Sequence, residues 1–173
     1  RRSRDVQVLY PCLNASMARN NRRMVTLREE LEVAEAYIFF VVQRFGDHLT
    51  VEKDVELKTL DGIVPLLPVQ PVLENAVEHG IAPAGGGLIR LSFRRAGDCV
   101  QVSILNSGKA LQPEDRAKVD AALSGENMNG QHLGLANIAN RLRLIYNGRA
   151  SIQVRSDEEG CTIVEMSIPQ DSE

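Results

Sequence analysis

The sequence lacks the features that define several classes of protein. None of its apolar runs approaches the roughly 18 residues that a membrane-spanning helix needs, so no span is predicted. Its three cysteines, Cys12, Cys99 and Cys161, form no C-x-x-C pair and have no histidine at ligand spacing, which argues against structural zinc and a disulfide framework and fits a reducing compartment. The net charge of −3 does not suggest a basic surface, so we expect no nucleic-acid partner.

The chain also lacks an initiator methionine, and its opening R-R-S-R has no apolar segment of the signal-peptide kind. We therefore interpret it as part of a longer protein. Its 173 residues, 43% hydrophobic and 25% charged, suffice for one domain with a core. Residues 1–24 are weakly patterned and interrupted by Pro11, and we expect them to be the remnant of an upstream element. Residues 25–173 form the predicted domain.

Apolar periodicity predicts long helices and antiparallel strands in this domain. Thr26 and Glu29 match a capping box, and the helix that follows reaches Gly46. Phe39 and Phe40 widen its apolar face and suggest packing on two sides. Strands are expected at 48–55, 88–95, 99–105, 151–155 and 162–168, with further helices at 68–80, 113–123 and 133–146. Without β-α-β alternation, this order favours an α+β fold in which a sheet packs on a layer of helices.

The helix at 68–80, P-V-Q-P-V-L-E-N-A-V-E-H-G, separates its residues into two faces. One face is apolar, and Gly80 is expected just beyond the helix end. The other carries oxygen and nitrogen ligands and no Lys or Arg, unlike most solvated helix faces. Its members are Gln70, Glu74, Asn75, Glu78 and His79. An ordinary exposed polar face is the alternative for this helix taken alone.

Two further motifs follow in order. L-N-S-G, residues 105–108, ends a predicted strand, and G-Q-H-L-G-L-A-N-I, residues 130–138, opens a helix. Glycines at a helix start let the backbone approach a phosphate closely, although this signal is weak by itself.

Together the three motifs resemble the N, G1 and G2 boxes of the GHKL ATP-binding superfamily, which includes gyrase, heat-shock chaperone ATPases and histidine kinases. Within it, V-T-L-R-E-E-L-E-V-A-E-A-Y, Q-R-F-G-D and N-R-L-R-L-I-Y resemble sensor histidine kinases of the LytS/YehU type. The resemblance covers residues 25–169. It implies a Bergerat-type two-layer α/β sandwich with a mixed, mostly antiparallel sheet that binds ATP and Mg²⁺.

The resemblance also implies roles for the residues of the first box. Asn75 matches the asparagine that holds Mg²⁺, and Glu74 and Glu78 are the other candidate catalytic residues beside it. Glu78 stands where many kinases carry Lys, so it cannot neutralise phosphate directly. His79 is a candidate for a phosphate contact, with a buried neutral histidine as the alternative.

The other boxes supply the remaining predicted nucleotide contacts. Asn106 stands where the superfamily has an aspartate that accepts a hydrogen bond from adenine, so selectivity for adenine stays open because an amide can also donate. Residues 109–129 would form a lid that is mobile until nucleotide binds. The further candidate contacts are Gly108, Gly130, His132, Leu133, Gly134, Leu135 and Thr162.

Two absences narrow the implied chemistry. Hydrolysing relatives carry a glutamate four residues before the N-box asparagine, and here that position is Pro71, so phosphoryl transfer to a protein fits better than hydrolysis. No phosphoacceptor motif is present, and His48, His79 and His132 are poor candidates. The chain is therefore expected to bind ATP without phosphorylating itself, with residues 1–24 as the end of the acceptor-helix region.

The resemblance implies partners beyond the nucleotide: an acceptor-histidine domain of the same protein, a response regulator, and a second copy in a full-length homodimer. It implies a cytoplasmic domain of a protein anchored in the bacterial membrane. Two alternatives stay open at this point: a regulatory scaffold whose nucleotide site has degenerated, suggested by Asn106, Glu78 and His132, and a stand-alone ATPase, which Pro71 disfavours.

Overall fold

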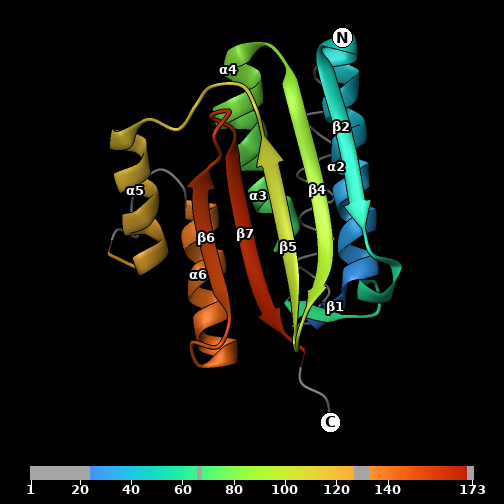
Figure 1. Ribbon diagram of the computed structural model, residues 1–173, viewed down its shortest axis with the longest axis vertical. Helices are drawn as coiled ribbons and strands as arrows, with labels where there is room; N and C mark the ends of the chain where they lie inside the picture. The colour runs from blue at the N-terminus through green and yellow to red at the C-terminus, as the bar shows by residue number, and fades with distance from the viewer. Residues whose placement is uncertain (1–23, 66–67, 127–132, 171–173) are drawn as a thin grey trace.

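A five-stranded sheet organises the domain in the computed structural model, which describes residues 24–65, 68–126 and 133–170. The strands lie in the order β2-β4-β5-β7-β6, and helices α2, α3 and α6 cover one face of the sheet (Figure 1). The predicted α+β sandwich is thereby confirmed. The strand bounds are β2 Leu49–Val55, β4 Gly87–Ala96, β5 Cys99–Asn106, β6 Ser151–Ser156 and β7 Thr162–Pro169.

The sheet is mixed and mostly antiparallel, as predicted. β4 turns into β5 through Gly97 and Asp98, and β6 turns into β7, so each pair forms an antiparallel hairpin. The expectation that β-α-β alternation is absent is wrong at one place, because β2 and β4 pair in parallel. Parallel neighbours need a crossover, and here it runs through η2 (Leu57–Thr59), β3 (Ile63–Pro65) and α3. β3 pairs with β1 (Met24–Thr26) in a separate ribbon.

Helix α2 spans Leu27–Phe45 with both predicted ends confirmed. The Thr26 hydroxyl accepts a hydrogen bond from the Glu29 backbone N–H at 3.2 Å, and Gly46 (φ +56°) terminates the helix before the short turn η1 (Gly46–His48). The expected packing on two sides is wrong for Phe39, which is 60% exposed. Adjacent residues on a helix point about 100° apart, and in the described chain the buried stripe of α2 faces the core.

The helix predicted at 68–80 continues further than expected. Helix α3 (Val69–Ala76) passes into the π-type turn η3 (Val77–Ile81) and then into α4 (Ala82–Ala84). The left-handed residue that ends it is Gly85, at φ +77°, and Gly80 does not have a positive φ. A π turn inside a helix is often found at a functional site. Residue 80, inside this turn, is glycine because a side chain there would collide with Asn106.

Helices α5 and α6 lie at the β6 side of the sheet, where α6 covers part of the helical face and α5 packs against α6. Helix α5 spans Pro113–Ser124 and α6 spans Leu133–Tyr146, both close to the predicted bounds. The periodicity of α6 also suggests Ile145 as a core residue, but Ile145 is 43% exposed and Tyr146 is buried instead. None of the helices in the described ranges is both long and apolar enough to cross a bilayer.

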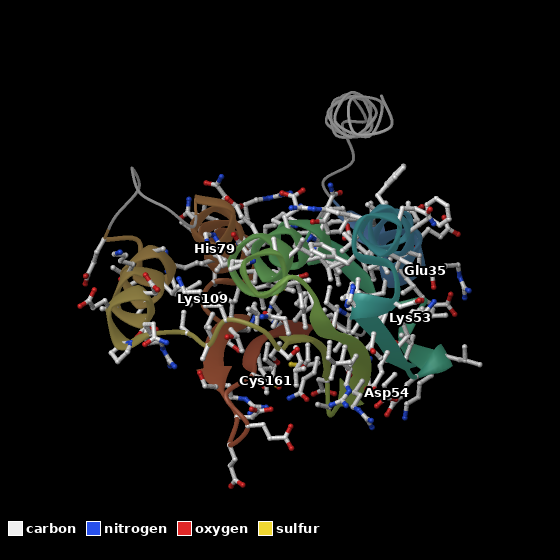
Figure 2. All side chains as sticks on the ribbon, turned by 90° about the horizontal axis from the view of Figure 1, so that it is seen from above. Glu35, Lys53, Asp54, His79, Lys109 and Cys161 are labelled. Carbon is white, nitrogen blue, oxygen red and sulfur yellow. The ribbon has the colours of Figure 1, made fainter. Side chains whose placement is uncertain are left out.

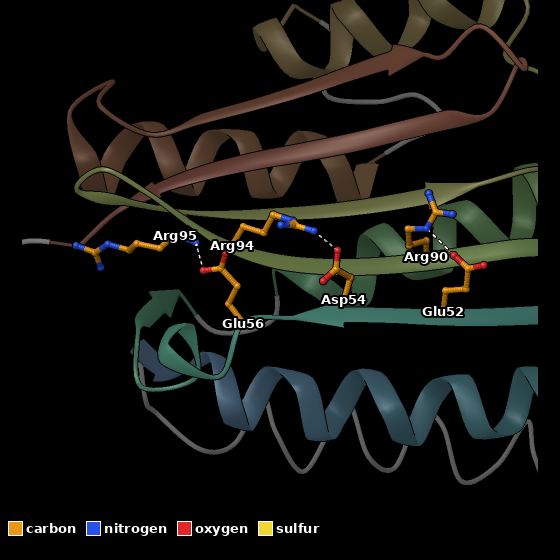
Figure 3. A network of polar contacts seen from close by, with 6 residues as sticks. All are labelled: Glu52, Asp54, Glu56, Arg90, Arg94 and Arg95. Carbon is orange, nitrogen blue, oxygen red and sulfur yellow. Dashed lines mark hydrogen bonds and ion pairs between the residues drawn. The ribbon is translucent and has the colours of Figure 1, made fainter.

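A ladder of polar contacts joins the edge strand β2, and Glu56 directly after it, to β4 (Figure 3). Its contacts are Arg90 with Glu52 at 2.6 Å, Arg94 with Asp54, and the Arg95 backbone N–H donating to Glu56 at 3.1 Å. The last hydrogen bond is the main cause that lowers the pKa of Glu56. Exposed ion pairs contribute about 0–1 kcal/mol each. The ladder therefore adds little to the stability of this parallel pair.

Candidate functional site

A cavity of about 350 Å³ lies between the helical layer, α5 and one end of the sheet. Figure 2 looks onto this end of the molecule and labels His79 and Lys109 between α5 and the α3–η3 helix. The volume of the cavity falls within the range of small-molecule sites. The lining residues are Asn75, Ala76, His79, Gly80, Asn106, Lys109, Ala110, Leu111, Asp115, Lys118, Val119, Leu135, Val154, Thr162 and Val164.

Asn106 presents a hydrogen-bond acceptor to this cavity. It ends β5, is 5% exposed, and its Nδ2 donates to the Ser107 carbonyl at 2.9 Å. Only the amide NH₂ can donate to a carbonyl, so this contact determines which way the amide faces. Oδ1 has no hydrogen-bond partner in the ranges that the structure describes. Oδ1 is therefore the atom of this amide that is left to accept a hydrogen bond from a ligand.

Thr162 lies directly opposite Asn106. The two residues are paired across β5 and β7, although 56 positions separate them in the chain. Opposed residues of an antiparallel pair have Cβ atoms about 4.5–5.5 Å apart, so both polar groups serve one end of the cavity. Leu135 of α6 with Val154 and Val164 of the last hairpin supply apolar walls. This combination suits a flat, partly polar ring.

The polar face of α3–η3 divides into two rows. Asn75 and His79, one turn apart, line the cavity, whereas Glu74 and Glu78 are not among its lining residues. The carboxylates instead influence Tyr37 of α2: burial raises the pKa of that phenol above its usual range, and Glu74 and Glu78 raise it further. Gln70 donates from Nε2 to Glu74 at 3.2 Å. The structure thus brings Asn75 to the site and leaves both glutamates on the side of α2.

Two glycines bring the helix and the end of β5 into contact. A Cβ on Gly80 would lie 2.0 Å from Asn106 Nδ2, and a Cβ on Gly108 (φ +103°) would lie 2.4 Å from the Gly80 carbonyl oxygen. The same carbonyl accepts from the Lys109 backbone N–H at 3.1 Å. Residue 80 must be glycine because a Cβ would collide with Asn106. Residue 108 must be glycine because a Cβ would collide with the Gly80 carbonyl and because its φ is positive.

The start of α6 approaches the helix on the other side of Asn75. A Cβ on Gly134 would lie 3.4 Å from Pro71 Cβ and 3.9 Å from Asn75 Nδ2. The predicted contacts Gly130 and His132 lie outside the described residues, and Leu133 is described only as the first residue of α6. Leu135, another of the candidate contacts, is buried and lines the cavity.

Lys109, Asp115 and Lys118 line the cavity and were missing from the predicted set of contacts. Lys109 directly follows the strand-end motif, which is the signal that could have suggested it. Lys118 lies one turn from Asp115 on α5, with the charged atoms 3.5 Å apart. No group of three His, Cys, Asp or Glu side chains suited to a metal ion occurs in the described ranges.

Comparison with known proteins identifies the family. Residues 67–172 match the model of the histidine kinase-, DNA gyrase B- and HSP90-like ATPases. The chain is 31% identical over 140 residues to the sensor histidine kinase YpdA of Escherichia coli K12, which covers 80% of this chain and 24% of that protein. It is 23% identical to the sensor protein LytS of Oceanobacillus iheyensis over 91% of this chain and 27% of that one.

The fold agrees with a solved structure. The catalytic domain of the histidine kinase ThkA superposes with a TM-score of 0.61 at 18% identity, covering 85% of this chain and 94% of that domain. The chain spans about a quarter of the length of the curated relatives that it matches. It belongs to the family of histidine kinase-, DNA gyrase B- and HSP90-like ATPases, in the group of LytS-type sensor histidine kinases.

Proposed function

We propose that this domain binds ATP with Mg²⁺ in the cavity and serves as the catalytic domain of a two-component sensor histidine kinase. The acceptor is a histidine outside this chain. The observation that carries the proposal is Asn106, which lines the cavity opposite Thr162 with its Nδ2 already bonded to Ser107 and its Oδ1 left to accept a hydrogen bond. When bound, ATP supplies the phosphoryl group and Mg²⁺ neutralises phosphate charge.

The residues present fit an adenine base. Asn106 Oδ1 can accept a hydrogen bond from the exocyclic amino group, and Leu135, Val154 and Val164 can pack on the ring faces. The neutral amide provides no charge assistance, so this contact is weaker than one made by a carboxylate. An acceptor still disfavours guanine at the same position, because guanine places a carbonyl oxygen there.

The residues also fit a magnesium ion that is held partly by the nucleotide. Mg²⁺ accepts oxygen ligands and usually keeps several waters, with one or two protein ligands and the substrate phosphates. Asn75 is the cavity-lining residue with a suitable amide oxygen on the helix face. Gly134 lies beside it, and the small residue leaves the backbone at the α6 start open to an approaching phosphate.

Transfer to a protein acceptor fits the site better than hydrolysis. Pro71, four residues before Asn75, is apolar and packs toward Gly134, so it can activate no water. The carboxylate that lines the cavity, Asp115, belongs to α5 and lies against Lys118. The chain's part in catalysis would then be to bind and orient, while an acceptor-histidine domain supplies the nucleophile.

Further partners and the location are part of the same proposal. The relatives are described as sensor histidine kinases and sensor proteins, and one solved structure shows the histidine kinase ThkA with the response regulator TrrA. We propose that a response regulator receives the phosphoryl group. We propose also that the full-length protein is a membrane-anchored homodimer with this domain in the cytoplasm.

Calorimetric titration with ATP and ADP, with and without Mg²⁺, tests the proposal. We expect Mg²⁺ to strengthen binding in the wild type and Asn75→Ala to remove that metal dependence. Asn106→Ala should weaken binding whether or not metal is present, because it deletes the acceptor for the base. The chain alone should take up no label from γ-labelled ATP.

Two results would contradict the proposal. No binding at millimolar nucleotide would favour a regulatory scaffold with a degenerate site. Steady release of phosphate by the wild type, lost on mutation of the cavity, would instead favour a stand-alone ATPase.

A further inference from the structure

The charged side chains of the cavity are distributed unevenly. The α3–η3 helix lines it with Asn75 and His79 and contributes no Lys or Arg to its polar face. Both lysines come from other segments, Lys109 from the residues after β5 and Lys118 from α5. With Asp115 as the acidic lining residue, the cavity has one excess positive charge in a chain whose net charge is −3.

The two lysines differ in what surrounds their charges. The Lys118 ammonium lies 3.5 Å from the Asp115 carboxylate, so part of its charge is already compensated. The Lys109 side chain is exposed, and its ammonium has no ion-pair or hydrogen-bond partner in the part of the chain that the structure describes. Lys109 is therefore the uncompensated cation of this cavity.

The backbone of Lys109 is held in place although its side chain is exposed. Its N–H donates to the Gly80 carbonyl at 3.1 Å, and the preceding Gly108 packs against the same carbonyl. Gly80 follows His79 directly, so these contacts place Lys109 beside the His79 end of the cavity-lining row (Figure 2). A lysine on a fixed backbone position loses less freedom when it binds an anion than one on an unanchored loop.

We propose that Lys109 binds the phosphate groups of the nucleotide and supplies the positive charge that the α3–η3 helix does not carry. This inference rests on the proposed function. It adds a side chain from the segment after β5 to the groups that would contact the phosphates. A lysine ammonium is a compact point charge that suits a phosphate oxygen.

Titration with adenosine, AMP, ADP and ATP, by calorimetry on the whole chain with Mg²⁺, separates phosphate recognition from base recognition. For Lys109→Gln we expect ATP and ADP to bind about tenfold more weakly, the size of one lost charge-assisted hydrogen bond. Adenosine should bind with unchanged affinity. Lys109→Arg should retain most of the ATP affinity, since it keeps the charge.

Lys58→Gln is the matched control, because Lys58 is also an exposed lysine but pairs with Glu56 beside η2, outside the cavity. It should bind all four ligands as the wild type does. Equal ATP affinity in Lys109→Gln and wild type would overturn the role proposed for Lys109 and leave the proposed function standing. An equal loss for adenosine and ATP would also overturn it, since that pattern indicates a structural role. A wild type that binds none of the ligands would overturn the proposed function and this inference with it.

Discussion

Replacing Gly80 with alanine tests the contact between the π turn and Asn106. The added Cβ would lie 2.0 Å from Asn106 Nδ2, 3.0 Å from its Cγ and 3.2 Å from the Ser107 carbonyl oxygen. The amide must therefore move away and lose its hydrogen bond to Ser107. We expect Gly80→Ala to lower both stability and nucleotide affinity.

The expected loss of stability combines three effects. Overpacking a close contact costs about 1–3 kcal/mol, and the lost hydrogen bond about 1 kcal/mol. Alanine in place of glycine inside a helix returns about 1 kcal/mol. The net destabilisation is about 1–3 kcal/mol, which corresponds to a Tm lower by roughly 2–12 °C for a domain of this size.

Thermal and urea unfolding of Gly80→Ala, Asn106→Ala and the double variant measure the coupling between the two positions. If the clash with the Asn106 side chain is the cause, the double variant should be more stable than the sum of the single changes predicts, by about 1 kcal/mol or more. Gly97→Ala, at a hairpin glycine with no atom within 4 Å of the added Cβ, should leave nucleotide affinity unchanged. A Gly80→Ala variant more stable than wild type, or strict additivity, would refute this account.

Two further predictions concern the core and the helix layer. In urea unfolding, Leu142→Ala should destabilise the domain by about 2–5 kcal/mol, because Leu142 is buried in the core. Leu144 belongs to the same helix but is 71% exposed, so Leu144→Ala should change the free energy of unfolding by less than about 0.5 kcal/mol. Similar effects at both positions would contradict the orientation of α6. Tyr37 should make the stability of the fold sensitive to alkaline pH, because the pKa of its phenol is raised in the folded state. As the pH rises, the unfolded state loses this proton first. The stability that Tyr37 contributes is therefore full below pH 10 and declines above it. Tyr37→Phe should show a shallower loss between pH 9 and 11, and identical slopes would rule the effect out.

Local patterns in the sequence were sufficient to predict most of the elements. The Thr26 cap and the end of α2 at Gly46 depend on neighbours within a few positions, and the structure has both. The end of the α3 helix was predicted at Gly80 but lies at Gly85. The prediction failed because glycine is selected both by close packing, as at Gly80, and by a positive φ, as at Gly85. A glycine in a sequence does not indicate which of the two requirements applies.

The site required the tertiary structure, since its parts come from distant segments. The sequence motifs identified Asn75, His79, Asn106 and Thr162, and the strand register is what pairs the last two. Helical spacing alone could not show that Glu74 and Glu78 would lie outside the cavity, because the direction of each row depends on how α3 packs against α2.

The sequence by itself determined the fold class, the family and the chemical types of residue available for nucleotide binding. These follow from periodicity and from motifs that lie within short stretches of chain. Only the tertiary structure decided which group of the Asn106 amide is already bonded, and that Lys109 rather than Lys118 carries the uncompensated positive charge of the cavity. The physical reason is that orientation and charge compensation depend on contacts between segments far apart in the chain.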